Sequence, residues 1–157
     1  MNPLIVLVED VESYALGLIG DLRQRFPELR EEGAIRLLAT ETEFHREFQG
    51  FAAVPPKLFI IDIMLRYQDP GTSDESVPPE IRDRANRDRF YRAGIRCAQR
   101  LRADSAFDPI GIILHTILDR ADLDSDQDYP FPRDCVHVLK EENGQRILAE
   151  VGRFLGR

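Results

Sequence analysis

The feature that most constrains the fold of this chain is a set of short runs that are apolar on both faces of a strand. Residues 4–8 (LIVLV), 57–61 (KLFII) and 110–114 (IGIIL) are rich in aliphatic, β-branched side chains. A strand that buries both faces suits the centre of a parallel sheet with helices on each side. Two further runs, 34–39 and 136–139, complete the five strands that we predict.

Four segments between and after these strands have apolar residues at helical spacing. Thr40 followed by Glu43 is a capping-box pattern, which predicts the start of the second helix. Gly94 lies inside the helical segment 80–103, where it costs about 1 kcal/mol relative to Ala. We therefore expect either one long helix or two pieces broken near Gly94. Because helices alternate with strands, we predict a parallel sheet covered on both faces. The segments are residues 13–26, a short one carrying Phe44 and Phe48, 80–103 and 143–154.

Composition limits the class of protein. The 157 residues, 43% of them hydrophobic, are enough for one domain spanning 1–157 with one core. Asp and Glu outnumber Lys and Arg by 28 to 21, which disfavours a general nucleic-acid-binding surface. We expect no membrane span, because no apolar run approaches about 20 residues, and no basic leader. Cys97 and Cys135 lack metal-motif spacing, which predicts reduced thiols in a cytosolic protein.

Polar side chains stand where the predicted strands end. Glu9 and Asp10 follow the first strand, Asp62 the third, Thr116 the fourth and Lys140 the fifth. The carboxyl ends of parallel strands meet at one edge of a sheet, which is where open α/β sheets bind ligands. Three converging carboxylates would raise one another's pKa values. A hard divalent cation such as Mg²⁺ relieves this repulsion, so we expect one here.

A carboxylate in such a cluster can attack phosphorus and form an aspartyl phosphate. Phosphoryl transfer then needs little more than positioning and charge neutralisation. Mg²⁺ and Lys140 would balance the phosphoryl oxygens, and the Thr116 hydroxyl would donate to one of them. The chain has only two lysines, and one of them stands where a compact point charge is needed. The strand ends therefore carry the parts that aspartyl phosphorylation needs.

Four segments around these residues resemble the motifs of response-regulator receiver domains, the CheY-like family. They are residues 8–10, 60–65, 112–116 and 138–140, in the right order at the ends of four strands. The resemblance covers most of the chain. It implies an α/β fold with a single doubly wound, five-stranded parallel sheet in the flavodoxin-like order 2-1-3-4-5, with helices on both faces.

The resemblance also implies a role for each residue at the strand ends. Asp62 would be the phosphoacceptor, and Lys140 would pair with the phosphoryl group. Thr116 would be the switch hydroxyl, and His137 stands at the family's aromatic switch position. Glu9 would act on the metal through water. The Mg²⁺ group would comprise Glu9, Asp10, Asp62 and the backbone carbonyl of Met64.

The function that the resemblance implies is signalling in a two-component system or phosphorelay. The phosphoryl group would come from a phosphohistidine on a sensor histidine kinase or a histidine phosphotransfer protein. The chain would help to catalyse its own phosphorylation and dephosphorylation. A conformational change would carry the signal to a downstream protein partner, and a homodimer is compatible with this scheme. We expect a cytoplasmic protein without nucleic-acid or membrane contacts of its own.

The chain departs from the family at several positions. Arg66 stands where Pro is usual, and Gly94 is the best match for a Gly that normally follows soon afterwards. This spacing predicts an inserted loop or helix extension at about 66–92, either a lid or a docking arm. Ile117 replaces a small residue and would crowd phosphoryl access. Residues 117–134 are acidic and contain prolines, which predicts an irregular segment in place of the fourth helix.

Two other functions stay open at this point. In the first, the chain is a phosphorylation-independent interaction module, a pseudo-receiver whose insertion and acidic segment form the partner surface. In the second, Asp62 is the nucleophile of a phosphohydrolase. The haloacid-dehalogenase type needs another Asp two residues later, where Met64 stands, which disfavours this reading. We interpret His115 as a packed strand residue and His45 as an ordinary helix residue.

Overall fold

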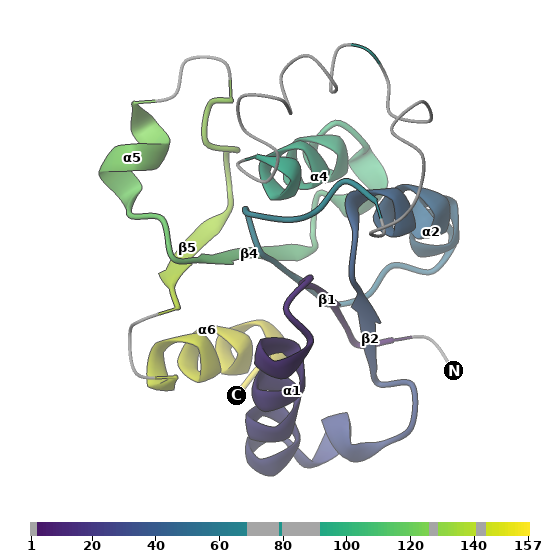
Figure 1. The fold of residues 1–157 in the computed structure, drawn as a ribbon. Coiled ribbons are helices and arrows are strands. Elements are labelled where there is room, and N and C mark those ends of the chain that lie inside the picture. The colour runs from purple at the N-terminus through teal and green to yellow at the C-terminus, as the bar shows by residue number, and fades with distance from the viewer. Residues whose placement is uncertain (1–2, 69–78, 80–91, 126–128, 141–143) are drawn as a thin grey trace.

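The computed structural model describes residues 3–68, 79, 92–125, 129–140 and 144–157. A sheet of five parallel strands in the order β2-β1-β3-β4-β5 forms its centre (Figure 1). The predicted order 2-1-3-4-5 and the parallel pairing are both confirmed. The strands are β1 (Ile5–Val8), β2 (Ile35–Leu38), β3 (Leu58–Ile61), β4 (Gly111–Thr116) and β5 (Val136–Leu139).

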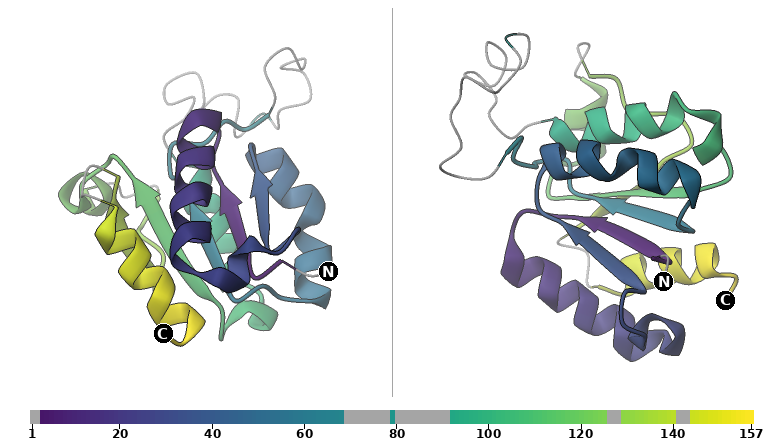
Figure 2. Two further views of the ribbon diagram at one scale, coloured as in Figure 1. Left: turned by 90° about the horizontal axis from the view of Figure 1, so that it is seen from below. Right: turned by 90° about the vertical axis from the view of Figure 1, so that its right-hand side faces the viewer.

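Helices cover both faces of the sheet, as the views in Figures 1 and 2 show. On one face lie α1 (Glu12–Arg25) and α6 (Gln145–Leu155). On the other face lie α2 (Glu41–Ala53) and α4 (Ala93–Arg102). Two short 3-10 helices follow α1 and α4, and they are η1 (Pro27–Arg30) and η3 (Ser105–Phe107).

Alternate side chains of each central strand build the two halves of the core. In β1, Ile5 and Leu7 pack with the α1 and α6 side, whereas Val6 and Val8 pack with the α2 and α4 side. All four residues of β3 are fully buried in the same alternating way. This two-sided burial explains why the runs in the sequence are apolar without interruption.

The N-terminus of α2 has the predicted cap. The Glu43 N–H donates to the Thr40 hydroxyl oxygen at 3.1 Å. In return, a Glu43 carboxylate oxygen accepts from the Ala39 N–H at 2.6 Å. In a standard capping box the second bond comes from the N–H of the N-cap residue, which is Thr40 here. In this protein it comes from Ala39, one residue earlier, and the pair of bonds still fixes where the helix begins.

Gly94 lies in the first turn of α4, not inside a long helix. Residues 80–91 of the predicted helix fall outside the described residues, and the described helix begins at Ala93. The Gly94 N–H donates to the Ile63 carbonyl oxygen at 3.1 Å. A Cβ on Gly94 would lie 2.7 Å from the Asp62 carbonyl carbon and 2.7 Å from the Ile63 Cα. The glycine is therefore needed for the close approach of α4 to the chain after β3.

The segment 117–134 is not irregular throughout, so that prediction is wrong in part. It contains the short helix α5 (Arg120–Asp124), which sequence reasoning missed. Asp119 caps this helix by accepting a hydrogen bond from the Asp122 N–H at 2.8 Å. Aspartate favours such a cap more than a helix interior, so the acidic run starts a helix but does not extend it. Residues 126–128, and residues 69–78 and 80–91 of the predicted insertion at 66–92, lie outside the described residues.

None of the described helices is long and apolar enough to cross a membrane. Both cysteines are free, as predicted. Cys97 is buried, and burial raises the pKa of its thiol well above the usual value. Burial also raises the pKa of Cys135, to about 11. Neither thiol is therefore activated as a nucleophile.

Candidate functional site

The sheet brings the predicted residues to its carboxyl edge through ladder hydrogen bonds. The Asp62 N–H donates to the Val8 carbonyl, and the Lys140 N–H donates to the Thr116 carbonyl, each at 2.9 Å. These bonds continue the pairing of β1 with β3 and of β4 with β5 by one residue. These bonds hold the backbone of Asp62 and Lys140 in the sheet, so the side chains that follow the strands converge at its carboxyl edge.

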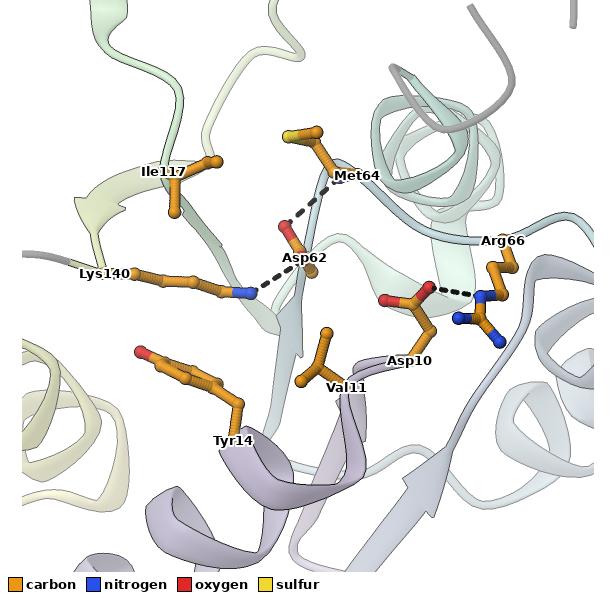
Figure 3. A pocket seen from close by; sticks show the side chains of 8 residues that line it. All are labelled: Asp10, Val11, Tyr14, Asp62, Met64, Arg66, Ile117 and Lys140. Atoms are coloured by element: carbon orange, nitrogen blue, oxygen red, sulfur yellow. Dashed lines mark hydrogen bonds and ion pairs between the residues drawn. The ribbon is translucent and has the colours of Figure 1, made fainter.

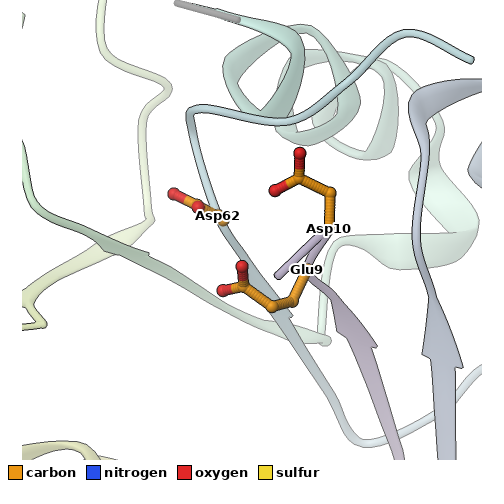
Figure 4. A group of neighbouring side chains, drawn as sticks. All are labelled: Glu9, Asp10 and Asp62. Atoms are coloured by element: carbon orange, nitrogen blue, oxygen red, sulfur yellow. The ribbon is translucent and has the colours of Figure 1, made fainter. Parts of the chain in front are cut away.

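Three carboxylates meet at this edge, as Figure 4 shows. Glu9, Asp10 and Asp62 each offer an oxygen, and these oxygens lie within 4.8 Å of one another. Burial raises the pKa of Glu9, and the bond from Lys140 offsets this only in part. Burial likewise raises the pKa of Asp10, with Arg66 opposing it and Asp62 adding to it. The cluster is therefore a place where extra positive charge is favourable.

Lys140 supplies part of that charge. Its ammonium donates to a Glu9 oxygen at 2.7 Å and to an Asp62 oxygen at 2.6 Å. The side chain is only 9% exposed, and its nitrogen lies 4.5 Å from the centre of the Tyr14 ring. Burial alone would lower the pKa of Lys140, but Asp62 and Glu9 outweigh it, so the pKa lies above its ordinary value. The lysine is thus a fixed positive charge between two carboxylates.

Asp62 faces a pocket of about 570 Å³ (Figure 3). One Asp62 oxygen accepts from the Met64 N–H at 3.2 Å, and the other from Lys140. Carboxylate oxygens are the donors that Mg²⁺ and Mn²⁺ prefer, so this donor set fits a hard divalent cation. Acidic, basic and apolar groups share the walls. The lining residues are Asp10, Val11, Tyr14, Asp62, Met64, Arg66, Ile117 and Lys140.

The two predicted switch residues lie beside this pocket but not in its walls. Thr116 is fully buried, and its hydroxyl oxygen accepts from the Leu118 N–H at 3.3 Å. A ring nitrogen of His137 lies 2.9 Å from the Leu118 carbonyl oxygen. Both side chains therefore contact the same residue of the β4–α5 connection. Ile117, which lies between Thr116 and Leu118 in the chain, is 56% exposed and lines the pocket. Its predicted effect, crowding of the phosphoryl group, stays a prediction.

Comparisons with known proteins add the fold family. No family model matches the chain, and no curated protein matches its sequence. Among solved structures, the signal receiver domain of a DNA-binding response regulator from Colwellia psychrerythraea 34H aligns with a TM-score of 0.62 and 14% identity, covering 98% of both chains. A two-component response regulator from Legionella pneumophila aligns with a TM-score of 0.62 and 16% identity, covering 99% of this chain and 100% of the other.

A third structure is the Mn²⁺-bound form of response regulator Rcp1, with a TM-score of 0.53 and 14% identity, covering 95% of this chain and 89% of the other. The chain has the receiver-domain fold. At these identities the likeness establishes how the chain folds. The receiver fold accounts for the meeting of Glu9, Asp10, Asp62 and Lys140, because all four follow strands that end at one edge.

Two residues near the site of this receiver fold were missed or left without a role by sequence reasoning. The Tyr14 hydroxyl lies 3.3 Å from a ring nitrogen of His115, and its ring lies under the Lys140 ammonium. Arg66, which we noted only as a departure, forms an ion pair with Asp10 at 3.2 Å. Tyr14 lies in the first turn of α1, but no signal in the sequence indicates either contact.

The buried His115 makes the stability of this receiver fold depend on pH. Burial, aided by the Lys140 charge, lowers the pKa of His115 from 6.5 to about 4. Between these values the unfolded chain binds a proton that the folded protein does not, so stability is lost as the pH falls through this window. We expect this residue to remove about 2 kcal/mol between pH 7 and pH 5. Urea unfolding at both pH values should show a smaller loss in His115→Gln, and equal losses would contradict this.

Proposed function

We propose that this protein is a signalling phosphoacceptor that receives a phosphoryl group on Asp62. The observation that supports this best is the placement of the Asp62 carboxylate at a pocket, 2.6 Å from the Lys140 ammonium and beside Glu9 and Asp10. A nucleophile, a fixed cation and a set of hard oxygen ligands are what phosphoryl transfer to a carboxylate requires. The solved receiver domains of the same fold provide a second, independent line of support.

In the proposed reaction, an Asp62 oxygen attacks phosphorus as the bond between phosphorus and the donor's histidine nitrogen breaks. An acyl phosphate forms, and the released imidazole takes up a proton. Asp10 and Asp62, with the Met64 carbonyl and with Glu9 acting through water, would hold Mg²⁺, which neutralises phosphoryl oxygens when bound. Lys140 stays beside Asp62 and pairs with a phosphoryl oxygen once that carboxylate has lost its charge. The donor would be a sensor histidine kinase or a histidine phosphotransfer protein.

The signal would leave through the β4–α5 connection. Thr116 does not line the pocket, so its hydroxyl, whose oxygen accepts from the Leu118 N–H, would have to move towards Asp62 to donate to a phosphoryl oxygen. His137 contacts the carbonyl of the same residue, so a movement there would reach β5 as well. A two-state surface of this kind can pass a signal by a shift of population to a downstream protein, or to a second copy of this chain. We place this exchange in the cytoplasm.

One observation favours the alternative of a phosphorylation-independent interaction module. Arg66 already pairs with Asp10, a residue that the phosphoacceptor role assigns to the metal. If that pair never opened, the site would be a structural charge cluster and partner binding would not depend on Asp62. The two functions therefore differ in one measurable property, the chemical reactivity of Asp62.

The test is to incubate the protein with Mg²⁺ and acetyl phosphate and to measure its intact mass. We expect the addition of one phosphoryl group, no addition without the divalent cation, and no addition to Asp62→Asn. The matched control is Asp108→Asn, which changes an exposed aspartate outside the site and should react like the wild type. An unmodified wild-type mass, or modification that persists in Asp62→Asn, would rule out this function and favour the interaction module.

A further inference from the structure

Arg66 occupies the carboxylate that a divalent cation would use. Its Nε lies 3.2 Å from an Asp10 oxygen, and Figure 3 shows the guanidinium directed at that carboxylate from the side opposite Lys140. The Asp10 side chain is 9% exposed and the Arg66 side chain 44% exposed. The arginine thus reaches from the solvent side of the pocket to a largely buried acid.

The backbone holds Arg66 in this place. Residues 40 and 66 form an isolated parallel bridge, and the Glu41 N–H donates to the Arg66 carbonyl at 3.0 Å. The next carbonyl, of Tyr67, accepts from the N–H and the hydroxyl of Thr42, at 2.9 and 2.6 Å. These bonds satisfy N–H groups in the first turn of α2 that have no partner within the helix. The start of α2 therefore anchors the chain that carries Arg66.

The described residues balance much of the charge of the cluster without a metal. Lys140 spans Glu9 and Asp62, and Arg66 pairs with Asp10. The two cations differ in how readily they can leave. Lys140 is 9% exposed and has two charged partners, whereas the Arg66 side chain is 44% exposed and pairs with Asp10 through Nε at 3.2 Å. Of the two, Arg66 is the cation that can move into water more readily, because its own side chain is already partly solvated.

We propose that Arg66 is a built-in competitor of the divalent cation at Asp10, so that the site binds a cation weakly until the arginine is displaced. This inference rests on the proposed function, because it concerns the metal that this function requires. A cation at the cluster and a guanidinium at Asp10 repel each other, and both draw on the Asp10 carboxylate. Binding of the metal must therefore include the free energy of breaking the Arg66–Asp10 pair. The 66–67 segment, fixed on α2, sets the strength of that competition.

The test measures the affinity for Mn²⁺ and for Mg²⁺ by isothermal titration calorimetry, without any phosphodonor. We expect Arg66→Gln to bind both ions about three- to tenfold more tightly than the wild type, the range for loss of a partly exposed ion pair beside a buried acid. The matched control is Arg157→Gln, which removes the same charge from an exposed pair with Glu28. Glu28 lies beyond the far end of α1, about 20 Å along its axis. This control should bind cations like the wild type.

The outcomes separate this inference from the proposed function. The competitor role of Arg66 is supported if Arg66→Gln binds cations more tightly than the wild type while Arg157→Gln does not. It is also supported if cation binding is detected only in Arg66→Gln. Equal affinities in the wild type and Arg66→Gln, or no binding in either, overturn it. The phosphorylation of Asp62, measured by intact mass, does not depend on that comparison, so the competitor role can fail while the phosphoacceptor role stands. Raising the salt concentration should shrink the difference between the variants, because the repulsion at the partly exposed arginine is screened.

Discussion

Replacing Gly94 by alanine should destabilise the protein by about 3 kcal/mol or more. The new Cβ would lie 2.7 Å from two backbone atoms, the Asp62 carbonyl carbon and the Ile63 Cα, and closer still to the Asp62 carbonyl oxygen. Backbone atoms cannot rotate away as a flexible side chain can. Either α4 moves off the sheet or the chain after β3 shifts, and each loses buried contacts. Chemical denaturation of the two proteins would measure the change in the free energy of unfolding.

The matched control is Gly20→Ala. Gly20 is also helical, in α1, but a Cβ there would meet nothing within 4 Å. Alanine should stabilise that helix by about 0.5–1 kcal/mol, because glycine is the poorer helix former. The two substitutions are chemically identical and should have opposite signs. A Gly94→Ala protein as stable as the wild type would show that α4 does not need its close approach to Asp62.

Gly94 also marks the boundary of what sequence patterns could predict. The apolar runs predicted five strands, and the alternation with helices predicted a parallel sheet, because those properties depend on periodicity and order along the chain. The proximity of Glu9, Asp10, Asp62 and Lys140 followed from the same rule, since parallel strands end at one edge. Helical spacing, in contrast, predicts Gly94 only as a cost inside a helix, and the family resemblance matches it to a glycine without giving the physical reason. Its need arises from a contact with residue 62, which no local pattern encodes.

Charged side chains show the same limit. Glu41 is an acid in the first turn of a helix, a position that is normally exposed, yet it is only 1% exposed. It pairs with Arg96 of α4 at 2.5 Å and with His45 one turn along, and Arg100 contacts His45 in turn. His45 is a helix residue, as predicted, but its contacts with Glu41 and Arg100 were not predicted. Helical periodicity shows which side of a helix is apolar, but the pairing of charges between α2 and α4 depends on how the two helices pack.

Replacing Lys140 by methionine should destabilise the protein by about 3–5 kcal/mol near neutral pH. Methionine keeps much of the side-chain volume and removes the charge. The Glu9 and Asp62 carboxylates, which are 2.7 and 2.6 Å from the ammonium, would then be buried together without a counter-charge. The only other lysine in the chain offers the control. Lys57 is exposed, and Lys57→Met should change the free energy of unfolding by less than about 0.5 kcal/mol.

The size of the Lys140→Met effect should itself depend on pH. Burial already raises the pKa of Glu9, and the bond from Lys140 lowers it, so removing the lysine should raise that pKa further. A carboxyl whose folded pKa lies above its unfolded value stabilises the fold when it is protonated, and this stability is lost as the pH rises from the unfolded pKa through the folded one. The difference between Lys140→Met and the wild type should therefore be small in acid and grow towards neutral pH. A difference that stays constant from pH 4 to pH 8 would mean that the lysine contributes packing rather than charge, and that the carboxylates at the strand ends do not need it.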